Sequence, residues 1–164
     1  MSLLKFIDAA KAGGWHHESS GARSETGGWM PNPNALTFGG GYYPTLVRGA
    51  VRVALENIDL YYHDHREWRG DPHVQPDDRV TIAAIVVDGE SRRKGLATAA
   101  MRDLQSVATS LGMGFNLHAC PMPAFKAKGK RTVTTGRLIR WYKSLGFLPA
   151  WPGESDTILV WRAK

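Results

Sequence analysis

The sequence predicts a single α/β domain, and three features of its second half carry that prediction. An apolar run over residues 82–87 is typical of a buried strand. A tight polar turn follows, and beyond it apolar residues recur at three- and four-residue spacing up to residue 111, as in an amphipathic helix. Residues 113–120 and 135–145 then repeat the order of strand and helix. A chain of 164 residues is long enough for one sizeable core.

The first half of the chain begins with a predicted helix over residues 3–12, which ends at Gly13 and Gly14. Residues 13–41 have the glycine- and serine-rich composition of a loop, yet they include Trp15 and Trp29. Long loops in compact domains are usually functional or disordered. We expect this segment to line an acceptor site, and disorder is the alternative.

The remaining elements follow in order along the chain. Residues 46–65 predict one or two strands, with a turn near Glu56 and Asn57 because asparagine favours turns. A loop precedes the strand over residues 80–88. The second helix, over residues 135–145, is preceded by a long lysine-containing connection and ends at a glycine. A final strand over residues 157–162 closes the sheet.

The turn between the apolar run and the first long helix has the character of an anion site. Free backbone N–H groups at the positive end of a helix attract anions, and Gly95 lets the backbone approach a ligand because it has no Cβ. The strings that define a P-loop or a dinucleotide-binding turn are absent. This turn therefore predicts a phosphate site of another kind. The alternative is a solvated basic turn.

Two blocks of sequence resemble the GNAT superfamily of N-acetyltransferases. Arg92, Gly95 and Ala97 match the spacing of that family's pyrophosphate loop, which follows a strand ending in valine. Residues 138–147, with Tyr142, three intervening residues and then Gly-Phe, look like the family's helix that ends in this pattern. The resemblance covers residues 80–164 and does not extend over residues 1–79.

The resemblance implies a mixed, mainly antiparallel central sheet with helices on both faces and central strands splayed into a V. It also implies acetyl-CoA as co-substrate, held by residues 80–164, while residues 1–79 of the same domain shape the acceptor side. The implied coenzyme-binding residues are Ile85, Val86, Val87, Arg92, Arg93, Lys94, Gly95, Leu96, Ala97, Thr98 and Thr135. Thr135 stands where the family often has asparagine.

Tyr142 is the candidate acid, because in the family the matching tyrosine protonates the departing thiolate. The alternative is a core residue, since Leu138, Trp141, Tyr142 and Leu145 form one helical stripe. A tyrosine can fill both roles, because a buried ring leaves its hydroxyl in need of a partner.

The base is harder to identify, because neither residues 80–87 nor residues 113–120 contain a carboxylate. His118 shares a strand face with polar neighbours, and an imidazole accepts protons near neutral pH. A structural histidine is the alternative. His63, Asp64 and Glu67 are rival bases. Cys120 as an acyl-carrying nucleophile is less favoured, because cysteine is often buried and inert.

No metal is expected, because no recognised ligand spacing links the pair His63 and His65 with His16, His17 or Cys120. The lone cysteine fits a reducing cytoplasm, and we expect a cytoplasmic protein. No apolar run approaches the roughly 20 residues that cross a membrane. The net charge of +6 suits coenzyme A; nucleic acid is a weaker candidate because the basic residues are dispersed.

The expected function is therefore transfer of an acetyl group from acetyl-CoA to an amine, on a small molecule or a protein, by direct attack in a ternary complex. The alternative is a non-catalytic protein of this fold that binds CoA or a partner. The sequence leaves the acceptor and the oligomeric state open, with a dimer as one option.

Overall fold

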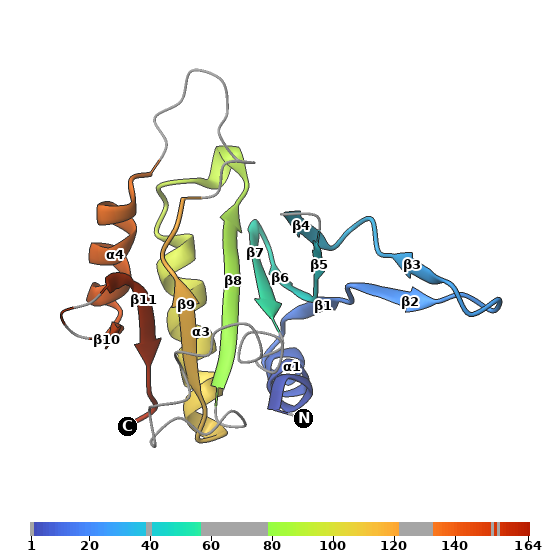
Figure 1. Ribbon diagram of the computed structural model, residues 1–164, viewed down its shortest axis with the longest axis horizontal. Helices are drawn as coiled ribbons and strands as arrows, with labels where there is room; N and C mark the ends of the chain where they lie inside the picture. Colours follow the sequence, from blue (N-terminus) through green and yellow to red (C-terminus); the bar gives the residue numbers. More distant parts are fainter. Residues whose placement is uncertain (1, 39–40, 57–78, 122–132, 152, 154) are drawn as a thin grey trace.

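The protein is seen here as a computed structural model, which describes residues 2–38, 41–56, 79–121, 133–151, 153 and 155–164. Its centre is a seven-stranded sheet in which only the pairing of β8 with β9 is parallel (Figure 1). In spatial order the strands are β1 (His16–Glu18), β6 (Thr45–Arg48), β7 (Val51–Glu56), β8 (Arg79–Val87), β9 (Gly114–His118), β11 (Ser155–Trp161) and β10 (Leu148–Trp151). The predicted mixed, mainly antiparallel sheet is confirmed.

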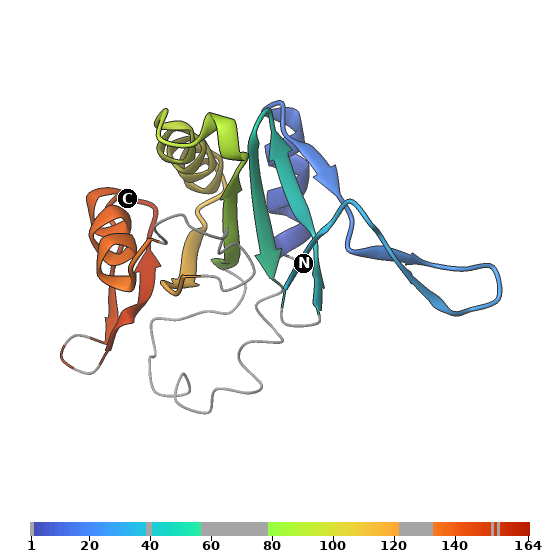
Figure 2. The same cartoon turned by 90° about the horizontal axis from the view of Figure 1, so that it is seen from above.

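The described helices are α1 (Ser2–Ala12), α3 (Leu96–Ser110) and α4 (Thr135–Ser144), and all three contribute to one hydrophobic cluster on one face of the sheet (Figure 2). We expected helices on both faces. Among the described residues the helices cover one face only, and the second face presents small or polar side chains such as Ala84, Thr81 and Asn116. Part of that face is covered by a short hairpin of β4 (Leu36–Phe38) and β5 (Gly41–Tyr43). None of the described helices combines the length and apolar character that a membrane span requires.

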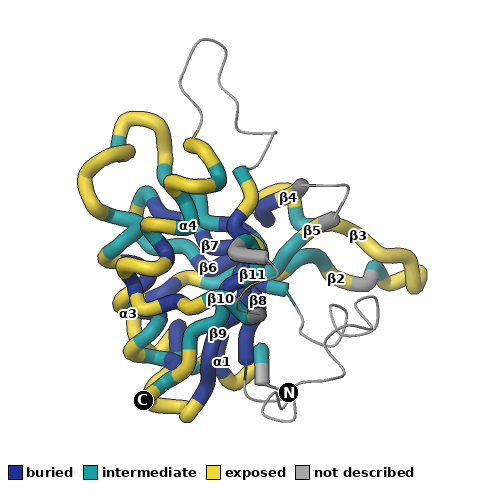
Figure 3. Tube along the Cα trace, turned by 60° about the vertical axis from the view of Figure 1, so that its left-hand side comes forward, coloured by how far each residue is buried: buried dark blue, intermediate teal, exposed yellow. Residues whose placement is uncertain are grey.

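The core lies between the helices and the sheet, where buried residues concentrate (Figure 3). Its largest fully buried side chains include Phe6, Met101, Leu104, Phe115 and Phe147. These come from α1, α3, β9 and the segment after α4, so both halves of the chain fill one core.

A polar junction also joins the two halves. The Trp15 indole donates to Asp103 Oδ2 at 2.7 Å, and Arg48 forms an ion pair with the same oxygen at 2.7 Å. The Arg48 guanidinium lies 4.8 Å from the centre of the Trp15 ring. We expected Trp15 to line an acceptor site. It is only 3% exposed and belongs to the core instead.

The segment over residues 13–41 is largely folded, which the sequence did not predict. β2 (Gly21–Arg23) and β3 (Trp29–Pro31) form an arm that projects away from the main sheet (Figure 1). Trp29 is 57% exposed and Met30 is 55% exposed on this arm. The aromatic residues of the segment therefore do not converge on one pocket of the described chain.

Five other predicted elements are confirmed, with bounds that agree to within two residues. They are the N-terminal helix, the strand before the anion turn, the helix after that turn, the next strand and the second long helix. Two details differ. The hairpin between β6 and β7 turns at Gly49, whose φ is 55°, a turn that was not predicted; the turn expected near Glu56 and Asn57 follows the end of β7 and lies outside the described residues. Strand β10 was not predicted.

Candidate functional site

The central feature of the site is a separation between β8 and β9. The two strands pair in parallel from Arg79 opposite Gly114 to Ile82 opposite Leu117, and no further. β8 continues to Val87 with pairing to β7 alone. Main-chain groups of residues 83–87 that point toward β9 therefore have no strand partner among the described residues. This is the V that the resemblance implied.

A β-bulge lies at the apex of this V. Ala54 pairs with Ala84 and Leu55 pairs with Ile82, so Ala83 is an extra residue on β8. A bulge bends a strand and increases its twist, and bulges are common beside active sites. Its extra residue also shifts the alternation, so that both Ile82 and Ile85 pack against the helix-side cluster. The bulge helps to turn β8 away from β9.

The V opens onto the predicted anion turn, which contains the 3-10 helix η3 (Gly89–Ser91) and leads into α3. Arg93 has φ 67° and Gly95 has φ 73°, both in the left-handed region. A non-glycine residue in that region is strained, and such strain persists mainly at functional sites. Gly95 caps α3 without a side-chain hydrogen bond, so N–H groups of the first helical turn keep their capacity to bind an anion.

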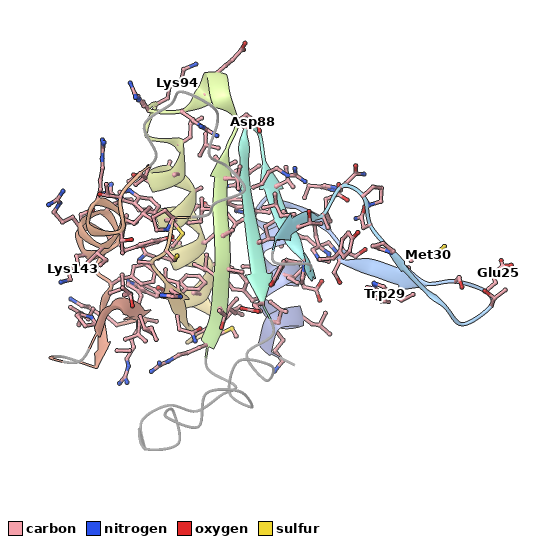
Figure 4. The ribbon with its side chains drawn as sticks, turned by 45° about the horizontal axis from the view of Figure 1, so that its top comes forward. Glu25, Trp29, Met30, Asp88, Lys94 and Lys143 are labelled. Atoms are coloured by element: carbon pink, nitrogen blue, oxygen red, sulfur yellow. The ribbon has the colours of Figure 1, made fainter. Side chains whose placement is uncertain are left out.

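Space and charge at the turn are compatible with a phosphate. A Cβ built at Gly95 would meet no atom within 4 Å. Arg92, Arg93 and Lys94 are exposed, and Lys94 extends outward in Figure 4. The Arg92 Nε donates to the Val87 carbonyl at 3.1 Å, which holds the guanidinium at the end of β8.

Tyr142 lies on α4 with its ring in the core. Its centroid is 4.6 Å from that of Trp141 and 5.4 Å from that of Phe147. Burial raises the pKa of the Tyr142 hydroxyl, so the group keeps its proton at neutral pH. In the described part of the chain that hydroxyl has no hydrogen-bond partner. The arrangement suits a proton donor to a bound group.

Helix α4 is held against the start of α3. The Trp141 indole donates to the Thr98 hydroxyl at 3.0 Å, and Thr98 is in the first turn of α3. Thr135 is the first residue of α4 and is half-buried, next to the N-cap Thr134, whose hydroxyl accepts from the Arg137 amide at 3.3 Å. The structure thus brings the turn and the helix that carries Tyr142 together.

His118 is exposed at the end of β9, one residue beyond the last pair with β8. It is beside the apex of the V, on the strand face opposite to Leu117, and its backbone pairs with Ile158. Cys120 is exposed nearby in sequence. The rival bases His63, Asp64 and Glu67 lie outside the described residues, as does His65.

Glu56 is a candidate site residue that sequence analysis missed. It is the last residue of β7, opposite Thr81 on β8, and half-buried. Burial raises the pKa of the Glu56 carboxyl. The sequence predicts a turn near Glu56 and Asn57, and the alternation of Val51, Val53 and Leu55, which continues to Glu56, could have placed Glu56 on the opposite face of the strand. Among the described residues, no group of three or more histidine, cysteine or acidic side chains is arranged to bind a metal.

Comparison with known proteins finds similarity in fold only. No family model matches the chain, and no curated protein matches it. Among solved structures it is similar to a GNAT family N-acetyltransferase, YhbS from Escherichia coli in complex with CoA, at 15% identity and a TM-score of 0.38, covering 98% of this chain and 67% of that one.

Two further structures are similar. The anti-CRISPR protein AcrVA5 is 16% identical with a TM-score of 0.48, covering 71% of this chain and 95% of that one. Ard1 from Thermoplasma volcanium is 14% identical with a TM-score of 0.40, covering 74% and 70%. At such identities and TM-scores, these likenesses do not decide what the chain binds or does.

Proposed function

We propose that the chain is an acetyl-CoA-dependent N-acetyltransferase that transfers the acetyl group directly to an amine. The observation that carries the proposal is the V between β8 and β9, which is open along β8 and leads to a turn shaped for an anion. A thioester coenzyme needs such a combination, because its pantetheine arm carries amides and its other end carries phosphates.

In this proposal the residues after the bulge hold the coenzyme. Main-chain groups of Ile85, Val86 and Val87 that lack a strand partner pair with the pantetheine amides. N–H groups of residues 93–98 bind the pyrophosphate, and Arg92, Arg93 and Lys94 supply positive charge around it. Thr135 contacts the coenzyme from α4.

Tyr142 supplies the acid. Its hydroxyl stays protonated because burial raises its pKa, and it has no competing partner among the described residues. Proton donation to the thiolate makes the thiolate a better leaving group in the transition state. His118, beside the apex of the V, stays a candidate base.

The alternative function is a CoA-binding or partner-binding module without catalysis. The exposed Trp29 and Met30 on the two faces of the β2–β3 arm favour it, because large apolar side chains left in water indicate a surface that a partner covers. The unpartnered Tyr142 hydroxyl favours the enzyme.

A transfer assay separates the two functions. The purified chain is incubated with acetyl-CoA and a mixture of primary amines (spermidine, tyramine and a lysine-containing peptide), and free CoA thiol and acetylated amine are measured. We expect thiol release that depends on the amine. If acetyl-CoA raises the melting temperature but no acetyl group is transferred, the binding-module function replaces the enzyme.

A further inference from the structure

A strip of polar side chains crosses the second face of the sheet, opposite to the helices. Glu56 on β7, Thr81 on β8, and Asn116 and His118 on β9 share this face. We propose that Glu56 is the general base of the reaction and that the acceptor is a positively charged primary amine that enters from this face. The proposal rests on the proposed function and assigns the role that the central strands left open.

The register places Glu56 beside the apex of the V. It pairs with Thr81, two residues before the bulge at Ala83. Adjacent strands are about 4.8 Å apart and residues rise about 3.3 Å, so the Cα atoms of Glu56 and Ala83 are roughly 8 Å apart. A glutamate side chain can span most of that distance. The thioester, held along β8 beyond the bulge, would therefore be within reach of an amine that contacts Glu56.

The burial of neighbouring residues on β7 shows to which face of the sheet the Glu56 side chain points. Val51, Val53 and Leu55 are buried in the helix-side cluster. Alternate residues of a strand point to opposite faces, so Glu56 points to the second face with Ala54. There Thr81 donates to Asn116 Oδ1 at 2.8 Å in a buried pair, which confirms that these side chains share the face.

Glu56 has the environment of a base and not that of a structural carboxylate. In the described part of the chain it forms neither an ion pair nor a hydrogen bond. Among the described residues, the titratable and charged groups beside Glu56 on this face are Tyr43, Arg52, Arg79 and His118; His16 and Glu18 share the face farther away, on β1. Burial raises the pKa of Glu56, and the nearby Glu56 charge, after burial itself, raises that of Tyr43. A half-buried carboxylate that forms no ion pair with a described residue attracts an ammonium group and accepts its proton more readily than an exposed one does.

The step balances with this residue as base. One proton passes from the acceptor ammonium to a Glu56 carboxylate oxygen, and the neutral nitrogen bonds to the thioester carbonyl carbon. The C–S bond then breaks, and the Tyr142 hydroxyl gives its proton to the departing sulfur. After the attack the nitrogen carries one proton more than the amide needs, and this proton passes through solvent to the Tyr142 oxygen. Glu56 releases its own proton to solvent. The net change converts ammonium and thioester into amide, thiol and one proton.

The experiment compares Glu56→Gln with the matched control Glu25→Gln, which changes an exposed glutamate at the end of the β2–β3 arm (Figure 4). Acetyl transfer to spermidine, tyramine and a lysine-containing peptide is measured across a pH series. We expect kcat/KM of Glu56→Gln to fall about 10²-fold near neutral pH, the scale of a positioned base, and to recover about tenfold per pH unit as the amine loses its own proton. Glu25→Gln should match the wild type.

Coenzyme binding distinguishes failure of this proposal from failure of the proposed function. Glu56→Gln should keep the rise in melting temperature that acetyl-CoA gives. A variant that binds acetyl-CoA and transfers at the wild-type rate and with the wild-type pH profile overturns the role of Glu56 and leaves the function intact. If the wild type transfers to none of the amines, hydrolysis of acetyl-CoA decides: equal rates in wild type and Glu56→Gln, or no hydrolysis in either, overturn the proposal.

Discussion

Gly95 combines a left-handed backbone with open space above it, and these two properties define a test of the anion turn. Its φ is 73°, and a Cβ there would meet no atom within 4 Å. Gly95→Asp would place bulk and negative charge where the phosphates bind. We expect acetyl-CoA to raise the melting temperature of the wild type and not that of the variant, because a ligand of the folded state stabilises it by mass action.

The control for this test is Gly112→Asp. Gly112 has φ 66° and equally open space, and it lies just beyond the other end of α3. Both variants meet a similar backbone penalty, of about 1 kcal/mol. Stabilisation of both variants by acetyl-CoA to the same extent would exclude the turn as the phosphate site.

Tyr142→Phe separates the acid role from the packing role. The substitution keeps the ring contacts with Trp141 and Phe147 and removes only the hydroxyl. We expect turnover to fall by about 10²-fold, the scale of a positioned acid, with little change in coenzyme affinity. The melting temperature should also change little, because the hydroxyl has no partner among the described residues. Wild-type turnover in the variant would mean that Tyr142 is a core residue only.

The raised pKa of Glu56 predicts an effect of pH on the stability of the protein as well as on its rate. Burial raises its pKa above the ordinary value of 4.5, so the folded chain binds this proton more tightly than the unfolded chain does. Its contribution to stability is therefore full below about pH 4.5 and is lost as the pH rises through the folded-state pKa. Glu56→Gln removes the charge, so its melting temperature should exceed that of the wild type near about pH 7, and the difference should disappear toward about pH 4. Thermal melts across this range, with Glu25→Gln alongside, measure it; equal differences at both ends would contradict the burial of this carboxyl.

At the scale of elements, the junction of β6 and α3 with Trp15, which lies between α1 and β1, depends on Asp103. Asp103→Ala would leave the buried Trp15 indole N–H without its acceptor and Arg48 without its ion pair. We expect a loss of about 1–3 kcal/mol in the free energy of unfolding, measured by urea denaturation. Asp8→Ala is the control, because Asp8 is exposed and its ion pair with Lys11 is at the surface. It should change stability by no more than about 0.5 kcal/mol. Equal effects of the two substitutions would contradict a structural role of the junction.

Elements whose apolar residues recur with a clear period were predictable from the sequence, and features without such a period were not. The spacing of Ala100, Met101, Leu104 and Ala108 predicted α3, and these residues are its buried face. The bulge at Ala83 has no sequence signal, because the pairing that defines it involves β7, far away in the sequence. Glu56 was missed for a related reason: Asn57 after it favours a turn, while its role depends on which residue of β8 lies opposite.

At the scale of the whole molecule, the sequence indicated the anion turn and Tyr142, but the residues alone could not give the positions of the two relative to each other. Strand β8 has nine residues and β9 has five. The V follows from this inequality together with the parallel register, which only long-range contacts determine. Residues 13–41 were the least predictable, because their glycines and serines obscure short strands that form by pairing with β6 or with each other. Trp15 gave no sign of its core position.

A crystal structure of the chain with acetyl-CoA tests the central claim most directly. We predict the pyrophosphate on the N–H groups of residues 93–98, the pantetheine arm along the unpaired edge of β8 after Ala83, and the thioester sulfur within hydrogen-bonding distance of the Tyr142 hydroxyl. Coenzyme bound elsewhere on the molecule, or a V that excludes it at concentrations far above those of other acetyl-CoA-binding proteins, would contradict the account.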